Sequence, residues 1–205
     1  MLMLELFKML SIGFIVGLTG ALVPGPMLFV TIDGTLKKGW RAGPEVFLGH
    51  AIIETVVLVL ILFGLTALIG ESEMAFISVA GGLALVVFGV MTIMGARKTS
   101  YDPKTQDKVQ SNSLVAGIVT SASNPYFWIW WLAAGSALVL ESYKIGMVAV
   151  LFFIIGHWLA DLGWFTAVSL SFSRGRGMFS QRAYKQILVA CGIFLILFGG
   201  WFAIA

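Results

Sequence analysis

Six long apolar stretches, separated by short polar loops, run along this chain. Each stretch is long enough to cross a bilayer, which takes about 20 consecutive apolar residues in one helix. The stretches lie at roughly residues 9–33, 45–69, 74–95, 114–140, 144–171 and 186–205. Between the third and the fourth lies the only distinctly polar segment, which indicates a flexible linker. The pattern therefore predicts an all-α integral membrane protein with six transmembrane helices.

The two halves of the chain repeat three glycine-containing patterns in the same order. The matches are Gly17 to Pro24-Gly25 with Gly117 to Asn124-Pro125, Gly49-His50-x-x-x-Glu54 with Gly156-His157-x-x-x-Asp161, and Gly82 to Gly89 with Gly192 to Gly199. Because each half has three crossings, the second half must enter the membrane from the opposite side. The sequence thus predicts two inverted-topology three-helix repeats, residues 1–100 and 113–205, an architecture shared by many transporters. A polar cytoplasmic linker, residues 101–112, joins them into one membrane domain.

Prolines interrupt the first and the fourth stretch at matching places. Pro24 and Pro26 lack backbone donors, and their rings clash with the preceding turn, so no regular helix runs through them. Asn124-Pro125 breaks the fourth stretch in the same way. Freed backbone groups in a membrane are tolerated only where protein or a water-filled cavity satisfies them, and transporters place substrate sites at such breaks. We therefore expect Pro24, Gly25, Pro26, Asn124 and Pro125 to bind substrate across a central cavity. The alternative is a simple proline kink.

Composition and charge indicate the class of protein and its orientation. The 205 residues are 59% hydrophobic and 11% charged, whereas a soluble domain needs far more polar surface. Eleven of the thirteen lysines and arginines lie in the loops after the first, third and fifth stretches, and Lys8 and Lys144 lie on the other side. The positive-inside rule then makes these three loops cytoplasmic and both termini extracytoplasmic. The net charge of +3 thus reports orientation in the cytoplasmic (inner) membrane and no nucleic-acid partner.

Two histidine–carboxylate pairs lie inside apolar stretches. His50 precedes Glu54 by four residues and His157 precedes Asp161 by four, so each pair shares one helix face. Ionisable groups at bilayer depth are costly and usually mark a proton, ion or substrate path. The pairs could exchange protons and couple transport to a proton gradient, or they could bind a divalent metal ion. The sequence leaves both uses open, beside a neutral pair that only packs helices.

Other side chains carry weaker signals. The single cysteine, Cys191, excludes an internal disulfide, and no nucleophile–base pair or cofactor motif indicates an enzyme. We expect Asp33 to form a local surface ion pair with Lys37, and Glu45 to occupy the first turn of the second helix, where the helix dipole favours an acid. In the aromatic run 126–131, one or two rings could line the cavity and offer a cation–π surface.

The first break also carries a resemblance. Pro24-Gly25-Pro26, followed by Thr-Ile-Asp-Gly-Thr-Leu-Lys-Lys-Gly39, resembles the first helix of the lysine-exporter (LysE/RhtB) family. Asn124-Pro125 resembles an Asn-Pro in that family's second half, and the stretch 82–89 is similar to its glycine-bounded third helix. The match spans most of the chain. One departure is Tyr126, where the family usually has lysine. The resemblance implies export of amino acids or related small metabolites by proton antiport.

We therefore predict a secondary transporter with an amino acid and a proton as its small-molecule partners, embedded in a lipid bilayer, without a cofactor. Whether it acts as a homodimer is left open. The main alternative is a divalent-metal exporter that uses the four residues of the two pairs, His50, Glu54, His157 and Asp161. A membrane scaffold without transport comes third, because it would leave the buried carboxylates without a role.

Overall fold

The protein is helical throughout the residues that its structure describes, and these contain no strand. The structure is a computed structural model, and it describes residues 2–22, 25–64, 112–175 and 180–204, with short pieces between 79 and 96. Three helices there are long and apolar enough to cross a membrane, Leu2–Ala21, Ala42–Leu62 and Met147–Gly175, and shorter apolar helices accompany them. The prediction of an all-α membrane protein is confirmed, whereas the count of six crossings stays a prediction. Most of the third stretch and of the linker lies outside the described residues.

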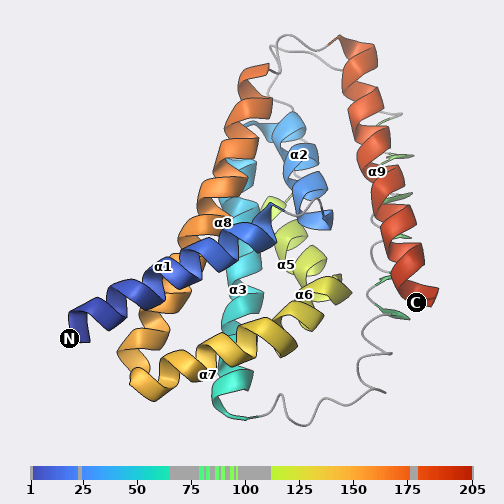
Figure 1. The fold of residues 1–205 in the computed structure, drawn as a ribbon. Coiled ribbons are helices and arrows are strands. Elements are labelled where there is room, and N and C mark those ends of the chain that lie inside the picture. Colours follow the sequence, from blue (N-terminus) through green and yellow to red (C-terminus); the bar gives the residue numbers. More distant parts are fainter. Residues whose placement is uncertain are drawn as a thin grey trace.

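The helices follow one another as Figure 1 shows, with the chain coloured from blue to red. In chain order they are α1 (Leu2–Ala21), α2 (Pro26–Lys38), α3 (Ala42–Leu62), α5 (Ser113–Ser123), α6 (Pro125–Trp130), a π-helical turn η2 (Trp131–Gly135), α7 (Ser136–Ile145), α8 (Met147–Gly175) and α9 (Gln181–Ile204). The long helix α8 runs behind α1 and beside α2, and α9 stands to one side of the other helices.

Both predicted helix breaks are present. Helix α2 begins at Pro26 after Gly25, whose backbone is extended (φ −129°, ψ −178°). Helix α6 begins in the same way at Pro125 after an extended Asn124, whose side-chain oxygen accepts a hydrogen bond from the Tyr126 amide at 3.1 Å. Proline suits this first helical position because the amide that it lacks would have no partner in the helix. The structural match to Asn124-Pro125 is therefore Gly25-Pro26, one residue later than the sequence alignment. Pro24 lies outside the described residues.

The second break is followed by an irregular helix that ends at Ile145, five residues beyond the predicted end of the stretch 114–140. After α6 the helix continues through the π-helical turn 131–135 into α7. A π-turn inserts an extra residue into a helix and re-aims the side chains around it. At Gly135, an added Cβ would lie 2.6 Å from the Trp131 ring. The absence of a side chain there lets the Trp131 indole lie against its own helix.

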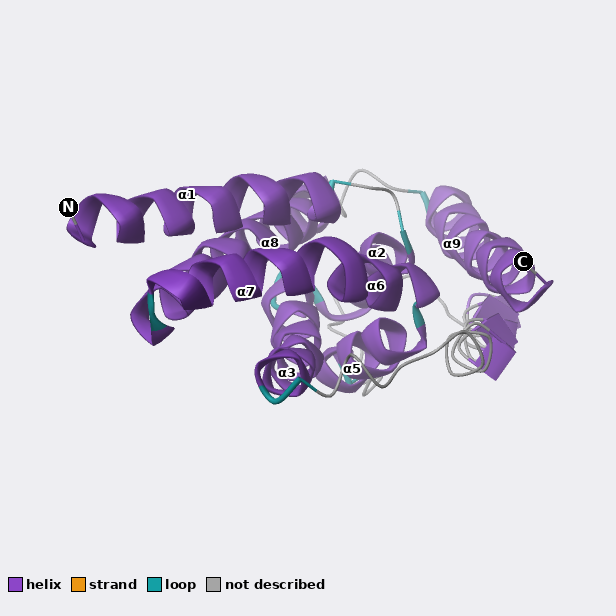
Figure 2. Ribbon diagram, turned by 60° about the horizontal axis from the view of Figure 1, so that its bottom comes forward, coloured by secondary structure: helices purple, strands orange, loops and turns teal. Residues whose placement is uncertain are grey.

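Glycines bring α1 and α8 into backbone contact. A Cβ at Gly13 would overlap the Phe153 carbonyl, and a Cβ at Gly17 would lie 2.8 Å from the His157 Nδ1 atom. From the other side, a Cβ at Gly156 would overlap the Leu10 carbonyl. Small residues allow such close approach between membrane helices, and Figure 2 shows α1 lying along α8. Gly13 and Gly17, four residues apart on one face of α1, form such a small-residue motif.

Helices α3 and α5 approach each other through glycines in the same manner. A Cβ at Gly49 would overlap the Leu114 carbonyl, and one at Gly117 would overlap the Val46 carbonyl. A third such pair joins the described pieces between 79 and 96 to α9. There, Gly82 faces the Gly199 carbonyl and Gly89 faces the Gly192 carbonyl. All three contacts join a helix of the first half to one of the second.

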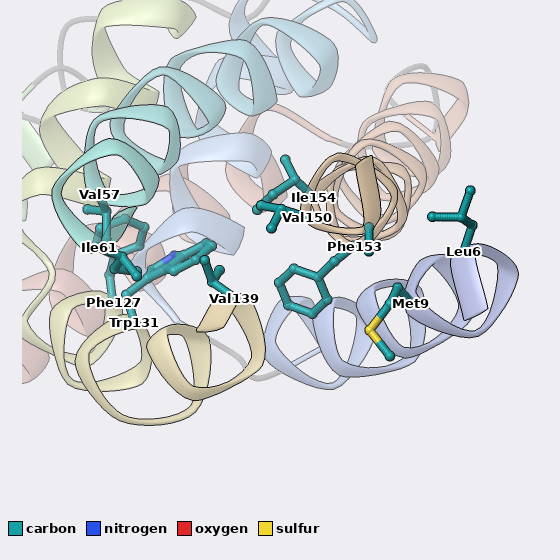
Figure 3. Close-up of a cluster of buried hydrophobic side chains, with 11 residues drawn as sticks. Leu6, Met9, Val57, Ile61, Phe127, Trp131, Val139, Val150, Phe153 and Ile154 are labelled. Carbon is teal, nitrogen blue, oxygen red and sulfur yellow. The ribbon is translucent and has the colours of Figure 1, made fainter. Parts of the chain in front are cut away.

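A cluster of buried apolar side chains fills the space between α1, α3, α7 and α8 (Figure 3). Phe153 on α8 is fully buried and points toward α1, while Trp131 is 1% exposed and packs near Val57 and Ile61 of α3. The cluster holds α8 at a fixed depth beside α3. It therefore fixes the position of the polar residues that lie farther along both helices.

Candidate functional site

The two predicted histidine–carboxylate pairs meet in one buried cluster. Helix α3 supplies His50 and Glu54, and α8 supplies His157 and Asp161. Within each helix, His50 Nε2 lies 3.2 Å from Glu54 Oε1, and His157 Nε2 lies 3.4 Å from Asp161 Oδ2. Glu54 is 1% exposed, Asp161 3% and His157 5%. We call these four residues the His–carboxylate cluster.

Contacts between the two helices are as close as those within them. His157 Nε2 lies 2.9 Å from Glu54 Oε1, and His50 Nε2 lies 3.7 Å from Asp161 Oδ2. Each imidazole therefore faces both carboxylates. The sequence predicted the two pairs from the spacing along each helix and left open whether the four residues act together. The close packing around α8 joins them, and this contact between distant segments has no signature in the spacing along the chain.

Ser121 on α5 holds the His50 ring in place. Its Oγ lies 2.7 Å from His50 Nδ1 and donates a hydrogen bond to the Gly117 carbonyl, also at 2.7 Å. A hydroxyl has one proton, so Ser121 accepts from His50 when it donates to Gly117. In that arrangement Nδ1 carries the hydrogen and Nε2 faces the carboxylates. His50 then either donates a second proton to them or turns a lone pair toward a cation.

Three polar atoms of the cluster are buried without a hydrogen-bond partner among the described residues. They are Glu54 Oε2, Asp161 Oδ2 and His157 Nδ1. Buried polar atoms are nearly always paired, so unpaired ones in a native fold require an explanation. Here all three belong to side chains that line a cavity.

That cavity has a volume of about 180 Å³, and both helix breaks lie on it. Gly25 and Pro26 line it from the first break, Asn124 lines it from the second, and the His–carboxylate cluster forms a third part of its wall. We call it the central cavity. The structure thus brings three of the five predicted break residues to the same space as the four ionisable ones. Pro125 begins α6 beside it.

Aromatic rings form much of the remaining wall. From the aromatic run, Tyr126, Phe127, Trp130 and Trp131 line the cavity, more than the one or two expected. Trp128 is turned elsewhere, because its indole donates a hydrogen bond to the Ala122 carbonyl at 2.8 Å.

Several lining residues were not predicted. These are Met27 on α2, Phe165 on α8, and Phe198 and Trp201 on α9, beside Ser121, which supports His50. Phe165 lies four residues after Asp161, and this one-turn spacing could have identified it. The two α9 residues reach the cavity by tertiary packing, for which the sequence carries no local signal.

Near the end of α2, the ion pair of Asp33 and the position of Glu45 are confirmed, but Asp33 is buried and the pair does not lie at the surface as expected. Lys37 Nζ lies 2.7 Å from Asp33 Oδ2, and Glu45 lies in the first turn of α3. Glu45 also pairs with Lys38, which ties the end of α2 to the start of α3.

Buried ionisable groups on a cavity between membrane helices are typical of membrane transport proteins. The family follows from the sequence as a whole. Residues 18–205 match the family model "LysE type translocator", and the chain belongs to this family of membrane transporters.

The chain is also similar to named proteins over most of its length. Urease accessory protein UreH of Bacillus sp. (strain TB-90) is 27% identical over 203 residues, which cover 89% of this chain and 86% of UreH. The uncharacterized membrane protein YahN of Escherichia coli K12 is 29% identical, over 84% of this chain and 81% of YahN. The chemotactic transduction protein ChpE of Pseudomonas aeruginosa is 28% identical, over 86% of this chain and 88% of ChpE. No solved structure matches the chain.

Proposed function

We propose that this protein exports amino acids or related small metabolites across the cytoplasmic membrane in exchange for protons. The observation that carries the proposal is the central cavity, because it joins both helix breaks to the His–carboxylate cluster. Membership in a translocator family supports the transport class. The substrate and the coupling ion are inferred from the chemistry of the cavity wall.

The cluster suits proton coupling because its groups are close enough to pass a proton between them. Nε2 of His157 lies 2.9 Å from one carboxylate and 3.4 Å from the other. Imidazole gains and loses a proton near neutral pH, and chains of Asp, Glu and His inside membranes serve as proton relays. The ammonium group of an amino acid is also a cation, and the same two carboxylates attract it. A proton and a substrate that compete for Glu54 and Asp161 would produce antiport.

The helix breaks suit the other end of an amino acid. The first-turn amides of α2 have no partner within their helix and carry the positive end of its dipole, which favours a carboxylate. Gly25 and Pro26 place this end of α2 on the cavity, and Asn124 lies on the same cavity wall. We therefore assign substrate binding to Gly25, Pro26 and Asn124, and we include Pro24 and Pro125 with them as neighbours in the two breaks.

The glycine contacts support the proposed architecture of two inverted three-helix repeats, residues 1–100 and 113–205 with the linker 101–112. In an inverted repeat each helix pairing between the halves has a symmetric counterpart. The α1–α8 and α3–α5 contacts are such counterparts. The Gly82–Gly199 and Gly89–Gly192 contacts are counterparts as well, because Gly82 corresponds to Gly192 and Gly89 corresponds to Gly199 in the two halves. With the positive-inside rule, this architecture puts both termini outside the cell.

A divalent-metal exporter is the second candidate, and one observation favours it. Ligand atoms of His50, Glu54 and Asp161 all lie within 4.8 Å of one another, and His50 Nδ1 has the outer-shell partner Ser121 that a metal-binding histidine usually has. The size of the cavity favours an organic substrate, because 180 Å³ far exceeds the space of about 10 to 15 Å³ that one water molecule needs.

Counterflow in proteoliposomes tests the proposal. The purified protein is reconstituted with a panel of unlabelled amino acids inside, and uptake of the labelled forms is measured beside a parallel panel of zinc, manganese and cobalt. We expect saturable exchange of at least one amino acid and none of the metals. Metal uptake without amino-acid exchange would contradict the proposal and favour the second candidate.

A further inference from the structure

We infer that the substrate carries one ammonium group and a large, uncharged apolar or aromatic side chain. This inference rests on the proposed function and narrows its substrate class. It follows from where the central cavity has charge, where it has aromatic rings and where it has open space.

The negative charge of the cavity wall is confined to one place. Glu54 and Asp161 are the only carboxylates among the described residues that line it. Both face the same imidazole atom, because His50 Nε2 lies 3.2 Å from Glu54 Oε1 and 3.7 Å from Asp161 Oδ2. One ammonium group can reach both carboxylates at this point. A second ammonium, such as that of a lysine side chain, would find no carboxylate elsewhere on the described wall.

A negatively charged side chain would find only the imidazoles of His50 and His157, and these already face Glu54 and Asp161. No lysine or arginine is among the described residues that line the cavity. Moving a charged group from water to such a site without a partner is strongly unfavourable. Cation–π contacts with the rings would offset only part of this cost for a second ammonium. The wall therefore selects against both basic and acidic side chains.

The rest of the wall suits an apolar side chain. Phe127 and Trp131 line the cavity from α6 and the π-helical turn, Phe165 lies one turn beyond Asp161, and Phe198 and Trp201 lie on α9. Aromatic rings and Met27 offer a large dispersion surface to a ring or a branched chain. A substrate with a small side chain would leave much of this surface without contact.

Gly20 on α1 gives a way to test the size of the substrate. It lines the cavity, and an added Cβ would meet no heavy atom of the described residues within 4 Å. A leucine at this position can therefore extend into the cavity without displacing the neighbouring helices. Gly163 on α8 provides a matched control. It has the same open surroundings, is exposed, and does not line the cavity.

The experiment measures counterflow of phenylalanine, leucine, alanine, lysine and glutamate by wild type, Gly20→Leu and Gly163→Leu. We expect wild type to exchange phenylalanine or leucine at least about tenfold faster than lysine or glutamate. A tenfold difference corresponds to the free energy of about one favourable buried contact. Gly20→Leu should lower exchange of the large substrates at least about fivefold more than that of alanine, and Gly163→Leu should match wild type.

Faster exchange of lysine or glutamate than of phenylalanine and leucine would overturn this inference and leave the exporter assignment intact. Unchanged exchange of the large substrates in Gly20→Leu would overturn it as well, because the open space would then not hold the side chain. Absence of exchange for every amino acid would instead contradict the proposed function itself.

Discussion

His157 on α8 lies closer to Glu54 on α3 than His50 does, although His50 shares a helix with Glu54. The distances from Nε2 to Glu54 Oε1 are 2.9 Å and 3.2 Å. The two helices come from different halves of the chain, so this contact joins the halves at the wall of the central cavity. Any movement that separates α3 from α8 at this depth must break it. A molecule that binds the Glu54 carboxylate therefore competes with the contact between the halves.

Replacing Ser121 should impair transport through His50. In Ser121→Ala the imidazole loses its Nδ1 partner, so its ring is no longer held toward the carboxylates. We expect counterflow to fall about tenfold, equivalent to ~1.4 kcal/mol and typical of one buried hydrogen bond. Ser121→Thr keeps the hydroxyl and should retain most of the activity.

Ser171→Ala is the matched control for this change. Its hydroxyl donates to the Ala167 carbonyl four residues earlier at 2.8 Å, as that of Ser121 does to Gly117. Ser171 is exposed on α8, ten residues beyond Asp161. If Ser121→Ala and Ser171→Ala transport equally well, the Ser121–His50 contact has no part in transport.

Replacing Gly156 should destabilise the fold, because its Cα faces the backbone of α1. In Gly156→Ala the new Cβ would overlap the Leu10 carbonyl and lie 3.0 Å from the Phe14 nitrogen. Backbone atoms cannot turn aside, so α1 must move away from α8. We expect the free energy of unfolding to fall by about 1–3 kcal/mol, measured as a lower thermal midpoint in detergent.

Gly163→Ala on the same helix controls for the change in helix propensity. Alanine favours a helix over glycine by about 1 kcal/mol at either position, and Gly163 has open surroundings. Gly163→Ala should therefore unfold at or above the wild-type temperature. Equal midpoints for the two variants would show that the α1–α8 contact is not tight.

The orientation in the membrane can be tested with single cysteines in a Cys191→Ser background. Arg41→Cys lies in the turn between α2 and α3, on the side that we assign to the cytoplasm. Lys144→Cys lies near the end of α7 on the opposite side. An impermeant thiol reagent applied to intact cells should label Lys144→Cys and spare Arg41→Cys. The reverse labelling pattern would invert the proposed topology.

The sequence predicted the class of fold and the breaks because these depend on local chemistry. Apolar length identifies membrane helices, and Pro26 and Pro125 cannot donate the hydrogen bonds of a continuous helix. The His50–Glu54 spacing likewise defines a helix face. In each case the physical cause lies within a few residues along the chain.

The union of the two pairs and the full cavity wall could not be predicted in this way. Contact between His157 and Glu54 depends on how α3 and α8 pack, and Trp201 reaches the cavity only through the placement of α9. The sequence alignment of the two halves also paired Pro24 with Asn124, whereas in the structure Gly25 takes the position that matches Asn124. A glycine and an asparagine both adopt the extended conformation before proline, so their different identities hid the match.

Glu54→Gln tests the central claim, that the His–carboxylate cluster couples amino-acid export to protons. Glutamine keeps the size and hydrogen-bonding capacity of Glu54 but cannot take up or release a proton. In proteoliposomes with a pH gradient, we expect net amino-acid flux to fall by about a hundredfold, as when a positioned proton-transfer group is removed. Exchange of substrate for substrate without a gradient should persist at a weaker apparent affinity, since it needs no net proton movement and Asp161 still offers the ammonium group a carboxylate. Saturable zinc or manganese binding by the wild type that is lost in Glu54→Gln, together with no amino-acid exchange by either protein, would contradict the account.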